Sequence, residues 1–230
     1  AIPIIKKRLR MDTSQVIINE ERPQLTKHLA TRFKEKIGQN VNLLGEVVLG
    51  NGEADHRYHH YLEALESPDI NYISVKISGI YAQTHALNYE ESFPELVSRM
   101  SALYQKAIDF PYTDEDGIKR SKFINLDMEE YKDAHFTLRL FKAVLNLPQF
   151  KNYSAGIVVQ AYLPDAYDFQ TELLEFAKAR VDGGGAPIKM RLVKGCNLEM
   201  ETVISSLKGW PNPIRPSKTE VDANYLCLLE

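Results

Sequence analysis

Five short apolar runs alternate along the chain with segments of helical periodicity, and this alternation limits the fold more than any other feature. The runs are rich in Val, Ile, Leu and aromatic residues and are bounded by turn residues, which is typical of strands. They cover residues 41–48, 72–79, 123–128, 156–162 and 188–195. Between them, apolar residues recur at three- and four-residue spacing, as in helices that bury one face. The alternation predicts a parallel sheet with crossover helices.

A parallel sheet can be open or closed, and the polar residues within the runs favour closure. In the run 72–79, Ile73 and Val75 alternate with Ser74 and Lys76, and the run 123–128 alternates in the same way. Strands of an open doubly wound sheet are apolar on both faces, whereas one face of a barrel strand points at the axis. No G-x-G-x-x-G follows the first run. We therefore predict an α/β fold, a (β/α)8 TIM-type barrel truncated after about five strands.

The domain organisation follows from the position of the first run. Before it, Leu25, Leu29, Phe33 and Ile37 are spaced four residues apart, which predicts a helix with one apolar stripe. We expect a helical segment at residues 1–40 that leads into a partial barrel at residues 41–230. The polar, turn-rich segment 109–121 is predicted to be a surface loop. Because the chain begins with Ala and ends within a helical pattern, we expect it to be a piece of a longer protein.

Composition excludes several classes of protein. The chain has 28 Lys and Arg against 31 Asp and Glu, a net charge of -3, so we expect no nucleic-acid binding in this segment. No apolar run reaches the roughly 18 residues that a membrane-spanning helix needs. The two cysteines, Cys196 and Cys227, are too few for a disulfide framework, which fits a reducing compartment. We expect a cytoplasmic protein.

Polar side chains stand late in successive runs, and in a barrel the ends of parallel strands meet at one mouth. They are Glu46, Lys76, Asp127, Gln160 and Arg191, with Lys194 just beyond. Because burying an unpaired charge is costly, these groups either pair with one another as an internal salt-bridge network or bind a ligand. The three cations suit a carboxylate, a phosphate or an electron-rich flavin, and the Gln160 amide suits a pyrimidine edge.

Other chemistries remain open on the residues alone. Lys76 suits a Schiff-base lysine of a barrel aldolase. A metal-dependent hydrolase and a non-catalytic scaffold barrel are further alternatives. His56 and His60 are four residues apart, which is a spacing of zinc ligands on a helix, but no third ligand follows at a telling distance. We expect a solvated helix face there and no metal.

Four ordered motifs carry a resemblance to a known family. They are ISVKIS from Ile73, NLDMEE from Asn125, VQAY from Val159 and RLVKG from Arg191. Each ends a predicted strand, and together they resemble proline dehydrogenases, most of all the proline dehydrogenase (PRODH) module of bifunctional, PutA-like proline-utilisation flavoenzymes. The resemblance runs from Asn42 to Tyr225, which is most of the chain.

The resemblance implies roles for individual residues. Lys76 is expected to pair with the carboxylate of L-proline, and Asp127 and Arg191 to be catalytic beside the substrate and the flavin. The implied FAD-binding residues are Met128, Gln160, Arg191, Val193, Lys194, Gly195, Cys196 and Lys218. Position 196 is Cys where the family usually has Ala. Asn197 and Leu198 stand where many members have Tyr and Trp, so the packing around the isoalloxazine is expected to differ.

The resemblance also implies the reaction. FAD-dependent oxidation of L-proline to 1-pyrroline-5-carboxylate, the first step of proline catabolism, proceeds by hydride transfer to the flavin. Electrons then pass to a quinone, which implies peripheral contact with the inner membrane, and a fused aldehyde dehydrogenase domain is implied as well. The family's last three strands and the helix with its paired arginines fall beyond Glu230. We therefore expect the fragment alone to be inactive.

Overall fold

A computed structural model describes residues 5, 8–9, 12–13, 18, 22–43, 48, 50–82, 84 and 88–230. The chain divides into two compact units, Ala1–Gln39 and Asn40–Glu230. The first unit contains helix α2 (Arg22–Lys34), after which Lys36 adopts a left-handed φ of 59°. Of the predicted apolar stripe, Leu29 is buried while Phe33 and Ile37 are exposed. Within the described ranges, no helix is both long and apolar enough to cross a membrane.

The second unit is built on a five-stranded sheet in the order β1-β2-β5-β6-β7. The strands are β1 (Val41–Asn42), β2 (Tyr72–Lys76), β5 (Phe123–Asp127), β6 (Gly156–Gln160) and β7 (Lys189–Val193). All neighbouring strands are parallel, so the predicted α/β fold with a parallel sheet is confirmed. In the part of the chain that the structure describes, β1 and β7 are the edges of this sheet, and its closure into a barrel stays a prediction.

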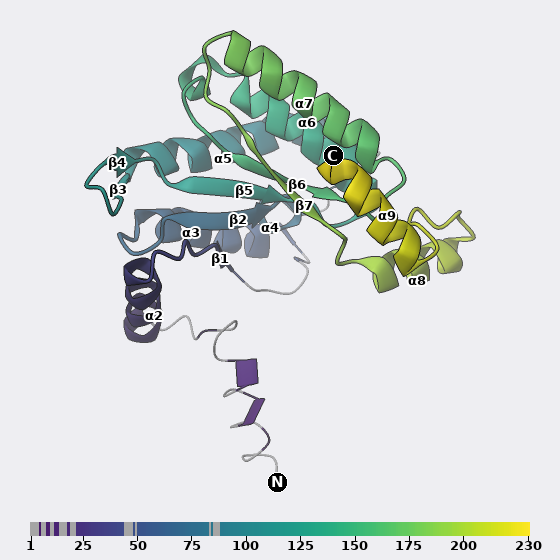
Figure 1. Ribbon diagram of the computed structural model, residues 1–230, viewed down its shortest axis with the longest axis horizontal. Helices are drawn as coiled ribbons and strands as arrows, with labels where there is room; N and C mark the ends of the chain where they lie inside the picture. The colour runs from purple at the N-terminus through teal and green to yellow at the C-terminus, as the bar shows by residue number, and fades with distance from the viewer. Residues whose placement is uncertain are drawn as a thin grey trace. The chain divides into compact units, whose positions relative to one another are not determined.

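Helices follow the strands, as the alternation predicts. They are α3 (Asn51–Glu66), α4 (Ile77–Ile80), α5 (Tyr89–Asp109), α6 (Ala134–Leu145), α7 (Ala166–Asp182), α8 (Leu198–Lys208) and α9 (Lys218–Leu229). The 3-10 turns η2 (Tyr131–Asp133) and η3 (Pro148–Phe150) flank α6. Figure 1 shows α5, α6 and α7 side by side over one face of the sheet, and α8 and α9 at the end towards which the strands point.

The core lies between this helical layer and one face of the sheet. That face carries side chains that are at most 1% exposed, namely Ile73, Val75, Ile124, Leu126, Ile157 and Val159. Their helical counterparts include Leu96, Met100 and Leu103 of α5 and Phe141 of α6, all fully buried. Burial of each such side chain contributes about 1.5–3 kcal/mol. This layer fixes which face of every strand is turned away from the helices.

The opposite face, which we call the inner face, carries the other residues of each strand. Strand register puts Tyr72 opposite Phe123 and Lys76 opposite Asp127 on this face. The two aromatic rings pack edge to face with 5.0 Å between their centroids. The inner face is therefore aromatic where the strands begin and charged where they end. In parallel α/β sheets, ligands bind at the carboxyl ends of the strands.

All five strands are shorter than the predicted runs, and the first two differ most. Within the predicted run 41–48, Val41–Asn42 is strand, and residues 44–47, which include Glu46, lie outside the described residues. The run 72–79 leaves the sheet after Lys76 because residues 77–80 wind into the single turn α4.

The segment 109–121, predicted to be a loop, contains a two-stranded hairpin of β3 (Tyr112–Thr113) and β4 (Lys119–Arg120). The Asp114 carboxylate holds its turn by accepting from the N–H groups of Asp116 at 3.0 Å and Ile118 at 2.8 Å. Gly117 supplies the positive φ of 78° that the turn needs. Turn chemistry, not apolar periodicity, specifies this hairpin.

Gly156 offers a test of the inner-face packing. A methyl group there would lie 2.6 Å from Asn125 Oδ1 and 2.9 Å from Phe123 Cε1. Gly156→Ala is therefore expected to displace both side chains and to lower the free energy of unfolding by about 1–3 kcal/mol in urea titrations. Gly52→Ala is the control, because no atom beyond its chain neighbours and its own helix backbone lies within 4 Å of the added methyl group. Equal stability of Gly156→Ala and the wild type would contradict this packing.

Candidate active site

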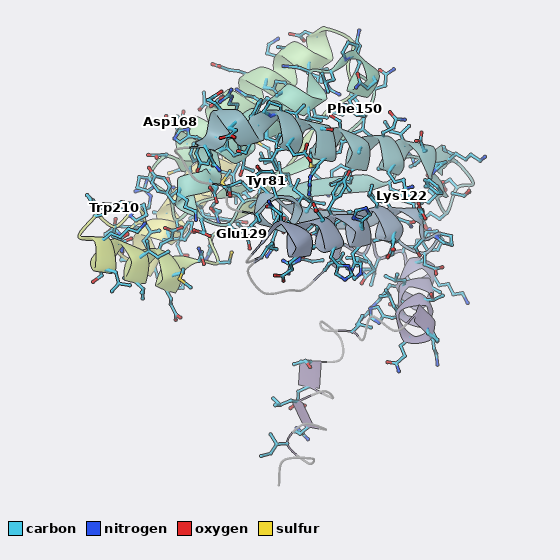
Figure 2. All side chains as sticks on the ribbon, turned by 180° about the vertical axis from the view of Figure 1, so that it is seen from behind. Tyr81, Lys122, Glu129, Phe150, Asp168 and Trp210 are labelled. Atoms are coloured by element: carbon cyan, nitrogen blue, oxygen red, sulfur yellow. The ribbon has the colours of Figure 1, made fainter. Side chains whose placement is uncertain are left out.

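The polar residues of the inner face meet around the end of β5. Figure 2 shows Glu129, just after this strand, at the opposite end of the sheet from Lys122, which directly precedes it. Lys76, Gln160 and Arg191 come from β2, β6 and β7, and each contacts a residue within 127–129. The structure therefore brings together four of the residues that the sequence singles out.

Asp127 and Arg191 form the first ion pair of the site. Arg191 Nη2 lies 2.5 Å from Asp127 Oδ1, although β6 separates their strands. The β6 residue opposite Arg191 is Val158, an uncharged side chain that does not compete for the pair. Asn125 Nδ2 at 2.7 Å and Ser74 Oγ at 3.2 Å donate to the same carboxylate oxygen. Asp127 thus accepts three hydrogen bonds on one oxygen.

Burial dominates the protonation of Asp127. Its side chain is 11% exposed, and burial raises the pKa of the carboxyl above its ordinary value. The positive charge of Arg191 opposes this most, followed by the hydrogen bonds from Asn125 and Ser74, without cancelling it. Asp127 therefore holds its proton more tightly than a solvated aspartate, and its charged form depends on these three neighbours.

Lys76 and Glu129 form the second ion pair. Lys76 Nζ lies 2.5 Å from Glu129 Oε1, and Ser78 Oγ donates to Oε2 of the same carboxylate at 2.9 Å. The sequence prediction did not include Glu129 among the site residues. Its signal was present in the alternation of Asn125, Asp127 and Glu129, which places all three on the inner face.

Gln160 connects β6 to the same segment. Its side chain is fully buried, and Nε2 donates to the carbonyl oxygens of Met128 at 3.1 Å and Glu129 at 3.2 Å. Within the described residues its Oε1 has no hydrogen-bond partner, although it is buried. Met128 is itself buried, with 3% of its surface exposed, and it contacts Gln160 through its backbone carbonyl. A buried acceptor without a donor is costly unless a ligand supplies one.

The last residue of β7 and the residue after it bond to the chain just beyond β6 through their backbone. The carbonyl of Val193 accepts from Ala161 N at 2.8 Å, and that of Lys194 accepts from Tyr162 N at 2.7 Å. Gly195 has a φ of 134°, and a Cβ there would overlap the Tyr162 ring. Only glycine fits this position without strain. The next predicted residue, Cys196, is exposed.

Two predicted cofactor residues meet at Asp222 of α9. Lys194 Nζ lies 2.6 Å from Asp222 Oδ1, and Lys218 Nζ lies 2.5 Å from Oδ2. Hydrogen bonds from Lys194 and then from Lys218 lower the pKa of the Asp222 carboxyl. Lys218 is largely exposed, so these two lysines form a second, solvent-facing cluster with a net positive charge.

The remaining candidates are Glu46, His56 and His60. Glu46 lies outside the described residues. The rings of His56 and His60 lie 4.3 Å apart between centroids on α3. Among the residues that the structure describes, no group of three or more His, Cys, Asp or Glu side chains is arranged to hold a metal ion.

Comparisons with known proteins agree on one family. The family model described as Proline dehydrogenase matches residues 25–230. Proline Utilization A (PutA) from Corynebacterium freiburgense is 42% identical with a TM-score of 0.88, over 96% of this chain and 22% of its own. PutA from Bdellovibrio bacteriovorus, in a structure inactivated by N-propargylglycine, is 30% identical with a TM-score of 0.81, over 98% and 24%. The chain thus spans less than a quarter of these proteins. None of the curated protein sequences compared with the chain matches it.

Asp127 gives a pH-dependent prediction. Because its pKa is raised on folding, the folded state binds more protons than the unfolded state between the ordinary and the raised pKa, and its contribution to stability falls as pH rises through that window. Asp127→Asn removes this fall. The free energy of unfolding of the variant, minus that of the wild type, should therefore increase from pH 4 to pH 7 in urea titrations.

The matched control for this titration is Asp168→Asn on α7, because it removes the same charge from an exposed side chain. Arg191 stays charged throughout this range, so the loss of its partner shifts the level of the curve and not its slope. A difference that stays flat or falls with pH for Asp127→Asn would contradict the burial argument.

Proposed function

The chain belongs to the proline dehydrogenase family, and we propose that the protein containing it oxidises L-proline to 1-pyrroline-5-carboxylate with FAD as the oxidant. The observation that carries the proposal is the convergence of Lys76, Asp127, Gln160 and Arg191 at the ends of four adjacent strands. Charged and amide groups on a buried face are costly unless they serve one another and a ligand. Lys76 and Arg191 are paired with Glu129 and Asp127, yet the buried Oε1 of Gln160 has no donor among the described residues.

The residues present fit a flavin. The unpartnered, buried Oε1 of Gln160 can accept from the ring N–H of a pyrimidine edge. Arg191 offers a cation to the reduced, anionic ring. A bound flavin would supply the oxidant by accepting the hydride from the substrate. Asp127 holds the Arg191 guanidinium by a 2.5 Å ion pair and so fixes its orientation.

The residues after β7 suit the rest of the cofactor. The backbone of Val193 and Lys194 is bonded to β6, and Gly195 packs directly against the Tyr162 ring, so this stretch is held in place beside the proposed cofactor. Lys194 and Lys218, which share one carboxylate between two cations, suit a pyrophosphate. Met128 and Cys196 complete the proposed FAD-binding set.

Substrate binding is assigned to Lys76. Its side chain is 30% exposed, so a small ligand can reach it, and a cation at the end of β2 suits the carboxylate of L-proline. The aldolase alternative gains no specific support here, because Lys76 is held in an ion pair with Glu129 and a Schiff base needs the free amine.

The wider proposal concerns the whole protein. Residues 41–230 form part of a (β/α)8 barrel after a helical segment at residues 1–40, and another part of the protein contains an aldehyde dehydrogenase domain, as the resemblance to bifunctional enzymes implies. Electrons leave to a quinone, so a cytoplasmic protein touches the inner membrane peripherally. Residues 1–230 alone are inactive in this proposal, since β7 has no further strand beside it in the described sheet.

The full-length protein provides the test. Anaerobic addition of L-proline is expected to bleach the visible flavin bands. Lys76→Met is expected to retain the flavin but to raise the KM for L-proline by about 10- to 100-fold, the value of one charged hydrogen bond. Lys119→Met, an exposed lysine of β4, is the control and should leave the KM unchanged.

The proposal has two ways to fail in this test. A full-length protein without flavin, or one whose flavin bands persist with L-proline, would exclude the reaction. A borohydride-stable adduct between Lys76 and a carbonyl substrate would support the aldolase instead.

A further inference from the structure

Asn40 begins a chain of hydrogen bonds that leads to Asp127. Its Nδ2 donates to Ser74 Oγ at 2.8 Å, and Ser74 Oγ donates to Asp127 Oδ1 at 3.2 Å. Strand register sets Val41 opposite the buried Ile73, so Asn40, one residue earlier, belongs to the inner face together with Ser74. Asn40 has no part in the site described above, yet one hydroxyl group separates it from Asp127.

Ser74 is the enclosed member of this chain. Its exposed fraction is 0%, whereas Asn40 is exposed at the outer end. Because Ser74 is closed to water, its hydroxyl relies on protein partners, and among the described residues these are Asn40 and Asp127. A buried hydroxyl that loses a partner is costly, so the state of either neighbour affects the other.

The direction of the two hydrogen bonds follows from the hydrogens available. A charged carboxylate can only accept, and a hydroxyl has a single hydrogen to donate. While Asp127 is charged, that hydrogen therefore goes to Asp127, and the bond between Ser74 and Asn40 has to be donated by the amide. Asn40 presents its Nδ2 to Ser74, which is the arrangement that suits a charged Asp127. Successive hydrogen bonds of this kind also polarise and strengthen one another.

We propose that Asn40 is a positioning residue of the proposed reaction, which commits the Ser74 hydrogen to Asp127 and so favours the charged aspartate that orients Arg191. Burial raises the pKa of the Asp127 carboxyl, so its charged form needs this support. The inference rests on the proposed function, because Arg191 matters here as the cation beside the flavin.

Other ionisable groups also face Asp127, from every neighbouring element. The cations Arg191 and Lys76 favour its charged form, Arg191 more strongly. Three acids interact with its charge but have a pKa raised mainly by burial, so they stay neutral near pH 7; they are Tyr61 of α3, Tyr72 of β2 and Cys196 after β7. Glu129 is paired with Lys76, and the full-length protein is expected to add the paired arginines beyond Glu230. All these groups are the same in the variants compared below, so a difference between variants reports the hydrogen bonds of Asn40 and Ser74.

The experiment titrates the full-length protein between pH 4 and pH 8, with its flavin oxidised and no substrate present, and records the visible flavin absorption. Because Arg191 is proposed to lie beside the ring, protonation of its partner changes the electric field at the ring and shifts the bands. The transition that Asp127→Asn abolishes is the titration of Asp127. Asn40→Leu is expected to move its midpoint upwards by about 0.4–1 pH unit, the value of one hydrogen bond to the charged form.

Asn40→Asp separates this role from a role in packing alone. Aspartate has the shape of asparagine but only accepts, so it takes the Ser74 hydrogen away from Asp127 and adds a negative charge. Its midpoint is expected to rise further than that of Asn40→Leu. A residue that only packs would leave both midpoints unchanged, and the variant of the same shape would be the milder one.

Ser74→Ala tests whether Asn40 acts through Ser74. It should raise the midpoint by itself, and adding Asn40→Leu to Ser74→Ala should produce no further shift. It also replaces Asn40→Leu if that variant does not fold. Asn152→Leu is the matched control, because Asn152 is an exposed turn residue before β6, at the start of the strand and not at its end, and its midpoint should equal that of the wild type.

Unchanged midpoints in the Asn40 variants, a smaller rise for Asn40→Asp than for Asn40→Leu, or additive shifts of Asn40→Leu and Ser74→Ala would overturn the inference. A wild-type titration without any transition that depends on Asp127 would do the same. Failure of the proposed function appears elsewhere, in flavin bands that L-proline does not bleach, and a protein without flavin overturns both. The two failures are therefore distinguishable.

Discussion

The candidate site depends on the segment at the end of β5, residues 127–129. Asp127 binds the guanidinium of β7, the carbonyls of Met128 and Glu129 bind the amide of β6, and the Glu129 carboxylate binds the ammonium of β2. Removing one partner from a partly buried ion pair leaves an unpaired charge, which is strongly unfavourable. The ends of β2, β6 and β7 are therefore joined to the end of β5 by polar groups that are costly to leave unpaired.

This convergence is possible because β6 has no long polar side chain on its inner face before Gln160. Between the long side chains of β5 and β7, its inner face presents Gly156 and Val158. The glycine leaves space that Asn125 and Phe123 fill. A longer polar side chain on β6 would compete for Asp127, and a bulkier residue at 156 would displace Asn125 from it. Small residues on β6 thus allow charged residues on its neighbours β5 and β7 to meet.

Much of the fold and part of the site could be predicted from the sequence, because a period of two fixes which face each strand residue occupies. The alternation in 72–76 and 123–127 places Lys76 and Asp127 on one face and Ile73 and Val75 on the other, as the structure has them. Gln160 and Arg191 are then indicated as polar residues within the predicted runs 156–162 and 188–195. The hairpin at 112–120 was missed because local turn hydrogen bonds, not apolar residues, specify it.

The partners in the two ion pairs could not be predicted, because the residue opposite Lys76 in the strand register is not the residue that its side chain contacts. Lys76 lies directly opposite Asp127, yet Lys76 bonds to Glu129 while Arg191 reaches over β6 to Asp127. Side-chain length decides this outcome, and sequence spacing does not encode it. Glu129 was missed for a different reason: the alternation of Asn125, Asp127 and Glu129 indicated its face, but it lies one residue beyond the predicted run 123–128.

The most direct measurement of the central claim is a crystal structure of the full-length protein with its cofactor. The account predicts that the isoalloxazine lies at the ends of β5, β6 and β7, with a ring N–H donating to Gln160 Oε1 and with Arg191 within hydrogen-bond distance of the ring. A flavin bound elsewhere, with Gln160 Oε1 still unpartnered and the inner face closed by its own ion pairs, would contradict it.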